Sequence, residues 1–209
     1  MTPSGSAASL AALLLCLALI APAAPARADA VDAAAQLYQE GNETAALERI
    51  EQYLLKNSND PRGRFLKAQL LAAKGDNEGA IALYTGLIDD YPELAEPYNN
   101  LAVIYAQQGR YELARNYLEQ AVQAFPEYAL ALENLGDVYA KLAEDSYRDA
   151  AQYDKTSSGL KSKIATLEQM LPDKTPTPVF RTPLPPKPVT SRKKKGSGSD
   201  ALPPPSPVH

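Results

Sequence analysis

Histidine and cysteine are nearly absent from this sequence, which has one of each in 209 residues, and tryptophan is missing altogether. The histidine is the final residue, His209, and the cysteine, Cys16, lies in an apolar run near the start. The single histidine and the single cysteine lie at opposite ends of the sequence. The chain therefore lacks Ser–His and Cys–His nucleophile pairs, His/Cys metal sites and intrachain disulfides. Carboxylates are plentiful, but pairs such as Asp89–Asp90 and Glu144–Asp145 are expected on exposed faces. The composition therefore predicts no enzyme, no metal and no cofactor.

The first 28 residues have the features of a signal peptide. Residues 9–20, "SLAALLLCLALI", form an apolar run that is short for a bilayer, which needs about 20 residues. The following "ARA" ends at Ala28 and fits the small-x-small pattern of a cleavage site. We expect cleavage after Ala28 and a periplasmic protein without cysteine, because Cys16 lies inside the run and follows Leu15 rather than a small residue. The segment "MTPSGSAA" lacks a basic residue, so an uncleaved membrane anchor is the alternative.

Charge divides the remaining chain into two parts. Residues 29–171 carry 13 basic and 23 acidic side chains, a net charge of −10. Residues 172–209 carry seven basic and two acidic side chains, a net charge of +5. An acidic body argues against nucleic-acid binding by the folded part.

A period of 34 residues runs through the acidic part. It links Gly41, Gly75 and Gly109, and it links several alanine and large apolar positions. Each unit holds two segments of helical periodicity that are separated by the glycine, which we expect just past a helix end in the left-handed conformation. Ala80 and Ala114 are expected to face Ala68 and Ala102 where the two helices of a pair cross. A fixed period of this length predicts stacked helix pairs, an all-α solenoid.

The pattern of large residue, Leu-Ala/Gly, Tyr, Gly, Tyr, Ala, Ala and Pro resembles the tetratricopeptide repeat. The third unit, "AEPYNNLAVIYAQQGRYELARNYLEQAVQAFPEY", matches almost throughout. The predicted units are 27–60, 61–94, 95–128 and 129–156, followed by a capping helix over 157–171. In the fourth unit Ala143 replaces the glycine and Arg148 replaces the small alanine, so either the turn is altered or the two helices run together.

The resemblance implies a concave groove lined by the first helix of each pair. The predicted groove residues are Phe65, Gln69, Asn99, Asn100, Val103, Gln107, Glu133, Asn134, Asp137 and Lys141. Related arrays hold a peptide backbone with stacked asparagines, and Asn100 and Asn134 lie one period apart. The Lys/Arg cluster with which chaperone-binding members clamp a terminal carboxylate is absent, which disfavours a co-chaperone role.

The segment 172–209 has a different composition, with 11 of the 18 prolines of the chain. It includes "PLPPKP" and the basic cluster Arg192, Lys193, Lys194 and Lys195. Too few apolar residues are present for a core, so we expect a disordered, solvated tail. It is either a spacer, an electrostatic tether to an anionic envelope surface or partner, or a cover over the acidic solenoid.

Together these features predict a non-enzymatic adaptor of the bacterial periplasm or cell envelope that binds an unidentified protein or peptide segment in its groove. The alternatives are a structural subunit of an envelope assembly that binds through its convex face, a protein that self-associates through the last repeat, and a cell-wall sugar-binding protein or enzyme accessory.

Overall fold

The computed structural model describes residues 27–171 and Pro185, and all regular structure in this part of the chain is helical. In chain order the helices are α1 (Arg27–Gln39), α2 (Glu43–Leu54), α3 (Pro61–Ala73), α4 (Asn77–Asp90), α5 (Ala95–Gln107), α6 (Tyr111–Ala124), α7 (Ala129–Tyr153) and α8 (Ser158–Met170). The predicted all-α fold is confirmed. The predicted cleavage site after Ala28 falls in the first turn of α1, and the rest of the predicted signal peptide lies outside the described residues.

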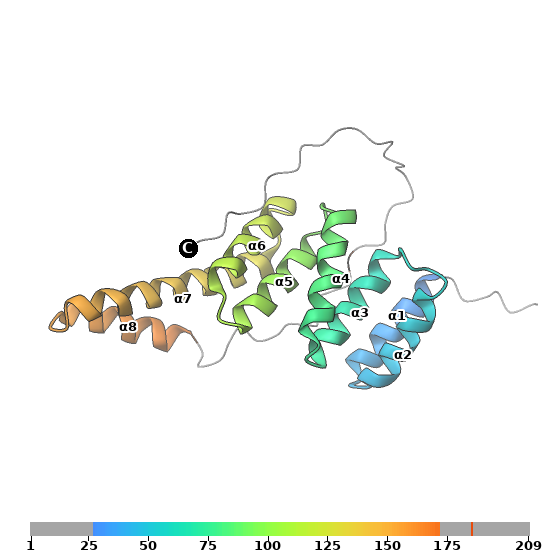
Figure 1. Cartoon of the computed structure of the whole chain (residues 1–209), viewed down its shortest axis with the longest axis horizontal. Helices are drawn as coiled ribbons and strands as arrows, with labels where there is room; N and C mark the ends of the chain where they lie inside the picture. The colour runs from blue at the N-terminus through green and yellow to red at the C-terminus, as the bar shows by residue number, and fades with distance from the viewer. Residues whose placement is uncertain (1–26, 172–184, 186–209) are drawn as a thin grey trace, which may run out of the picture.

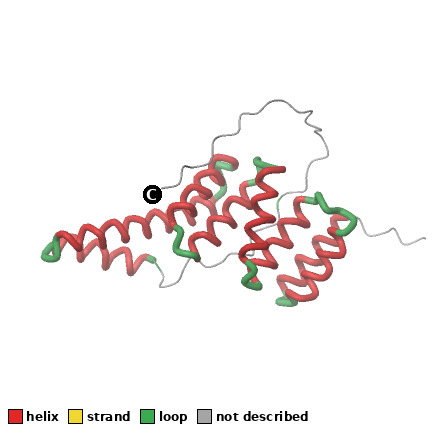
Figure 2. Tube along the Cα trace, viewed as in Figure 1, coloured by secondary structure: helices red, strands yellow, loops and turns green. Residues whose placement is uncertain are grey.

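The helices form antiparallel pairs that stack along the long axis of the molecule (Figure 1; Figure 2). Three of these pairs are α1–α2, α3–α4 and α5–α6, and each packs against the next through α2–α3 and α4–α5 contacts. First helices of neighbouring pairs also touch, α1 with α3 and α5 with α7. The apolar core runs between the two helices of each pair and continues from pair to pair, because no pair can bury its apolar face alone.

The periodic glycines end the first helix of three pairs. Gly41, Gly75 and Gly109 have φ of 84°, 85° and 74°, the left-handed region that glycine adopts at little cost. At Gly109 the backbone N–H of the next residue, Arg110, donates to Tyr105 O at 2.9 Å, and Gly109 N–H donates to Ala106 O at 3.0 Å. This is a Schellman motif, which satisfies carbonyls at the helix end. The predicted role of these glycines is confirmed.

Substituting Gly109 by alanine is expected to lower the free energy of unfolding by about 1 kcal/mol, the cost of a left-handed L-residue. An added Cβ meets no atom within 4 Å there, so the loss reports backbone conformation alone. Gly136 is the matched control, because it lies inside α7 and an added Cβ is equally free of contacts. Gly136→Ala is expected to raise the free energy of unfolding by about 0.5–1 kcal/mol, because glycine inside a helix is less favourable than alanine. If urea unfolding showed that both substitutions change the free energy of unfolding in the same direction, the left-handed conformation assigned to Gly109 would be contradicted.

The small residues of the period are completely buried. Ala34, Ala68 and Ala102 on the first helices and Ala46, Ala80 and Ala114 on the second helices are all 0% exposed. Ala68 and Ala80 belong to one core cluster, and Ala102 and Ala114 belong to the next. Methyl side chains at these positions permit the close approach of the helices in each pair.

The fourth unit is not a hairpin that turns near Ala143. Helix α7 continues to Tyr153, so the helix pair expected within residues 129–156 is one long helix. Alanine at position 143 favours continuation, because a left-handed helix end would strain it. The chain turns back only at α8, which packs along α7 (Figure 1). The described part of the solenoid thus has three hairpins and a fourth pair, α7–α8.

Helix α8 begins as the sequence predicts. The Ser157 hydroxyl accepts from Leu160 N–H at 3.3 Å, the hydrogen bond of an N-cap. Its predicted apolar face, Leu160, Ile164, Leu167 and Leu171, is half-buried, and no residue of α8 is fully buried. The helix therefore covers α7 with one apolar stripe and leaves its other sides to solvent.

Glu144 corrects the expectation that the paired carboxylates are exposed. It is 4% exposed, whereas Asp89, Asp90 and Asp145 are exposed. Lys141 Nζ donates to its carboxylate at 2.8 Å and Arg148 Nε donates at 2.7 Å. Arg148 also pairs with Glu168 of α8. The arginine that breaks the small-residue rule of the repeat therefore links α7 to α8.

Glu144→Gln is expected to lower the free energy of unfolding by about 1 kcal/mol at neutral pH, because it weakens two ion pairs of which one partner is buried. The Lys141 hydrogen bond, supported by Arg148, lowers the pKa of Glu144, and burial opposes this shift only in part. A lowered folded-state pKa stabilises the fold above the unfolded-state pKa, and this contribution is lost as pH falls through the folded-state pKa. Urea titrations between pH 7 and pH 3 should therefore show the difference from the parent chain shrinking with acidity. A difference that stays constant would contradict this role.

Candidate peptide-binding groove

The row of first helices carries an unusual amount of buried polar surface. Gln69 of α3, Asn99 and Asn100 of α5 and Asn134 of α7 are 2%, 0%, 1% and 8% exposed. Amides at such depth require hydrogen-bond partners. They come from successive first helices, so they form a polar seam along the stack.

Within this seam three asparagines and one tyrosine form a chain of hydrogen bonds. Asn134 Nδ2 donates to Asn99 Oδ1 at 2.8 Å and thereby joins α7 to α5. Asn99 Nδ2 donates to Asn100 Oδ1 at 3.3 Å, and Asn100 Nδ2 donates to the Tyr84 hydroxyl at 2.9 Å. Asn100 makes a further interaction beyond these hydrogen bonds, and Gln69 also has an interaction partner. The amides thus connect three consecutive repeats through side chains rather than standing as separate rungs.

Tyr84 is the residue of this chain that the sequence analysis missed. It is 0% exposed, and its ring lies edge-on to Phe65 with centroids 5.6 Å apart. Burial raises the pKa of its phenol far above the ordinary value, and the hydrogen bond from Asn100 only partly opposes this, so the group stays neutral. The period places Ile50 and Leu118 at the equivalent positions of neighbouring units. A hydroxyl at an otherwise aliphatic core position was the available signal.

The predicted groove residues fall into three classes of exposure. Phe65, Gln69, Asn99, Asn100, Val103 and Asn134 are buried, Gln107 and Lys141 are half-buried, and Glu133 and Asp137 are exposed. They share the first-helix row, but most do not present open surface. Their role in binding a partner stays a prediction.

The exposed end of this row is acidic. Glu133 and Asp137 lie one turn apart on α7, and Glu96 is half-buried at the start of α5. Partial burial, with the Glu133 charge, raises the pKa of Asp137, and burial raises the pKa of Glu96. The neighbouring charges of Glu133 and Asp137 favour a cation at this end of the row, whereas the raised pKa of Glu96 reflects burial alone.

Pro185 departs from the expectation of a fully solvated tail, because it is buried. It belongs to the "PLPPKP" segment, whose other residues lie outside the described part of the chain. The basic cluster Arg192, Lys193, Lys194 and Lys195 also lies outside it.

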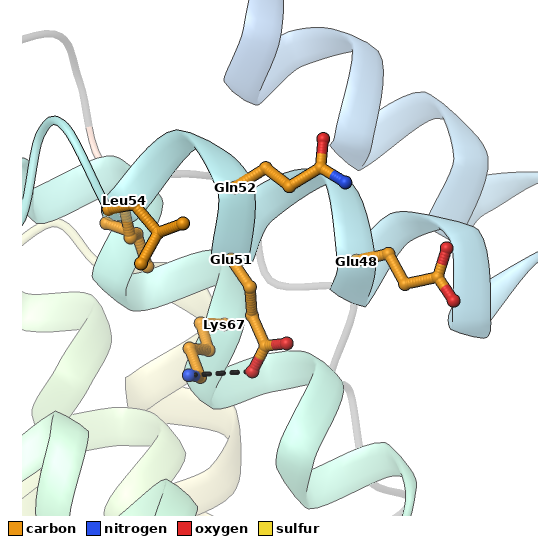
Figure 3. A pocket seen from close by; sticks show the side chains of 6 residues that line it. Glu48, Glu51, Gln52, Leu54 and Lys67 are labelled. Atoms are coloured by element: carbon orange, nitrogen blue, oxygen red, sulfur yellow. Dashed lines mark ion pairs between the residues drawn. The ribbon is translucent and has the colours of Figure 1, made fainter.

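A separate depression lies between α2 and α3 (Figure 3). Glu51 and Lys67 point toward each other there and form an ion pair of 2.8 Å, whereas Glu48 and Gln52 point away from it. Leu55 beside it is 85% exposed. A satisfied surface ion pair beside an open apolar side chain gives no convergent set of binding groups.

The described residues contain no group of three or more His, Cys, Asp or Glu side chains that could hold a metal ion. Cys16 and His209 lie outside this part of the chain. No helix within residues 27–171 combines the length and the apolar character needed to cross a membrane. The apolar run of residues 9–20 is not described.

Comparison with known proteins supports the fold of stacked helix pairs. Two sequence models of the tetratricopeptide repeat match, one over residues 64–127 and the other over residues 31–95 and 99–156. Uncharacterized protein ycf37 of Pyropia yezoensis is 35% identical over 82 residues, which cover 37% of this chain and 46% of the relative. Photosystem I assembly protein Ycf3 of Cyanophora paradoxa is 29% identical over 129 residues, which cover 59% of this chain and 72% of the relative. The chain thus spans about half the length of its ycf37 relatives.

Among solved structures, the thermophilic tetratricopeptide-repeat protein TTC0263 of Thermus thermophilus superposes with a TM-score of 0.53 at 26% identity. The match covers 69% of this chain and 82% of that chain. The superposition agrees with the tetratricopeptide-repeat fold of stacked helix pairs.

Proposed function

The chain belongs to the tetratricopeptide repeat family, and from this premise we propose that it is a non-enzymatic adaptor that holds an extended segment of a partner protein along its first-helix row. The observation that carries this proposal is the seam of amides contributed by Asn99, Asn100 and Asn134 on two neighbouring repeats. Side-chain amides carry both donors and acceptors, the groups that match a peptide backbone of any sequence. The partner segment would lie along the seam, beside the hydrogen bonds that these asparagines make to one another.

The surroundings of the seam indicate which segments would fit. Phe65 and Val103 supply apolar contact beside the amides, while Glu133 and Asp137 supply negative charge at one end. An extended segment with small apolar residues and a nearby Lys or Arg matches both features. We therefore expect recognition through backbone hydrogen bonds, with charge setting orientation and the rate of encounter.

The relative named as a photosystem I assembly protein supports a role in assembling other proteins. We extend this to an envelope setting because residues 1–28 have the features of a secretory signal peptide. The partner would then be a component of a periplasmic or membrane-associated complex.

Photo-crosslinking tests the groove without disturbing the core. Substituting Asn100 or Asn134 would also break contacts between repeats, so half-buried Gln107 and exposed Asp137 are better sites for a photoreactive residue. Gln123, exposed on α6, is the matched control. In the native host, the same partner protein should form adducts from positions 107 and 137 and not from position 123. Adducts only from position 123 would favour binding through the second helices and overturn the groove proposal.

Export makes a separate prediction about the mature N-terminus. Protein recovered from the envelope fraction should begin at Asp29, because the peptidase is expected to cut after Ala28. Mass spectrometry of the intact protein measures this directly. Recovery of the chain with residues 1–28 attached to the membrane would instead indicate the uncleaved anchor.

A further inference from the structure

The central part of helix α5 is buried on every side. All eight residues from 97 to 104 are buried, and eight consecutive residues span more than two turns, so they point in all directions. Among the described elements only α4, α6 and α7 make substantial contact with α5. These neighbours belong to the two-layer stack, which by itself leaves the inner face of the first-helix row open.

Two positions of the 34-residue period locate the covered region. The first position holds Phe65, Asn99 and Glu133 in the second, third and fourth units. The second position holds Gln69, Val103 and Asp137 in the same three units. The residues of the second and third units are at most 3% exposed, whereas those of the fourth unit are exposed. The inner face is therefore closed over α3 and α5 and open over α7.

One described residue outside the helical body is buried, and it is Pro185. It lies in the only other part of the chain that the structure describes, so its burial points to contact between the proline-rich segment and the solenoid. From the end of α8 the segment 172–185 reaches about 40 Å at about 3.1 Å per residue. Helix α8 runs back toward the stack (Figure 1), and adjacent helices lie about 8–10 Å apart. The segment is long enough to reach α5 and α3.

The chemistry of "PLPPKP" fits the covered face. Its four prolines lack backbone N–H groups, so the segment presents mainly carbonyl acceptors to the amide donors of Gln69, Asn99 and Asn100. Proline and leucine side chains match the apolar contact offered by Phe65 and Val103. The charges are also opposite, with +5 on residues 172–209 and −10 on residues 29–171.

We propose that residues 183–188 of this chain bind along the inner face of α3 and α5 as an intramolecular ligand, which a partner segment must displace. This inference rests on the proposed function, because it assigns the chain's own tail to the same groove. A flexible tether gives an effective concentration in the millimolar range, so even a weak self-ligand competes strongly. The tail would thus set a threshold of partner affinity or concentration below which the groove stays closed.

The test uses the full mature chain and a labelled peptide of residues 180–190, "FRTPLPPKPVT". In one variant Pro183, Pro185, Pro186 and Pro188 are replaced by serine, which removes the self-ligand. In the matched control Pro203, Pro204, Pro205 and Pro207 are replaced by serine, which changes the same number of prolines further along the tail. Fluorescence anisotropy should show the peptide binding the first variant at least about tenfold more tightly than the parent chain or the control. Hydrogen exchange in α3 and α5 should also be faster in the first variant.

Equal peptide affinity for all three proteins, or binding to none, would overturn the proposal. Crosslinking from positions 107 and 137 separates this failure from failure of the proposed function. If the partner adducts form but the peptide does not bind, the groove accepts a partner and the tail is not its ligand. If the peptide binds the first variant tightly and no partner adduct forms in the host, the tail inference stands and the adaptor function fails.

Discussion

Replacing Tyr84 by alanine is expected to lower the free energy of unfolding by about 3–5 kcal/mol, the range for deleting a large buried side chain. The ring is 0% exposed and packs edge-on against Phe65. Its hydroxyl accepts from Asn100, which continues the chain of amides to the next repeat. The substitution therefore leaves a cavity in the core and removes a hydrogen-bond acceptor from the polar seam at the same time.

Tyr153→Ala is the matched control, because Tyr153 is 93% exposed and its loss should change the free energy by less than about 0.5 kcal/mol. Tyr84→Phe separates the two effects of Tyr84. It keeps the ring and removes the hydroxyl, so we expect a loss of about 1 kcal/mol. Urea unfolding followed by circular dichroism measures all three variants. A loss for Tyr84→Ala as small as that for Tyr153→Ala would show that the seam does not stabilise the stack.

The parts of the fold that were predictable are those fixed by local geometry and repeated every 34 residues. Gly41, Gly75 and Gly109 require a left-handed backbone, and each carries it. The alanines at helix crossings are buried because the spacing between helices recurs with the period. A single sequence contains three copies of each such signal, so the pattern stands out from chance.

The features that were not predictable depend on contacts that occur once. Asn99 pairs with Asn134 across 35 positions, and no periodic rule distinguishes that pairing from exposure of both amides to a ligand. Glu144 is buried because Lys141 and Arg148 neutralise it, an arrangement specific to the last unit. For the fourth unit the sequence allows two arrangements, because the absence of glycine removes a stop signal without specifying how far the helix continues. Pro185 is buried, which the proline-rich composition of its segment does not indicate.

Ala114→Leu is the second substitution with a large expected effect, a loss of about 1–3 kcal/mol in the free energy of unfolding. Ala114 is 0% exposed on α6 and shares a core cluster with Ala102 of α5 and with Leu118. Three added carbon atoms have no space there, so α5 and α6 must separate or adopt strained side-chain conformations. Because α5 carries the amide seam, the same change is expected to loosen the groove.

Ala150→Leu is the control for introducing a leucine, because Ala150 is exposed on α7. We expect it to change the free energy of unfolding by less than about 0.5 kcal/mol. The pairing of the two alanines is tested by a double-mutant cycle with Ala102→Gly, which removes the facing methyl group. If the alanines are in contact, the double variant should be more stable than the sum of the single losses predicts, by at least about 0.5 kcal/mol. If the two losses in the free energy of unfolding add within about 0.3 kcal/mol, Ala102 and Ala114 are not in contact and the overpacking lies elsewhere. The small residues of the period would then reflect the packing of each helix separately and not the crossing between the two helices.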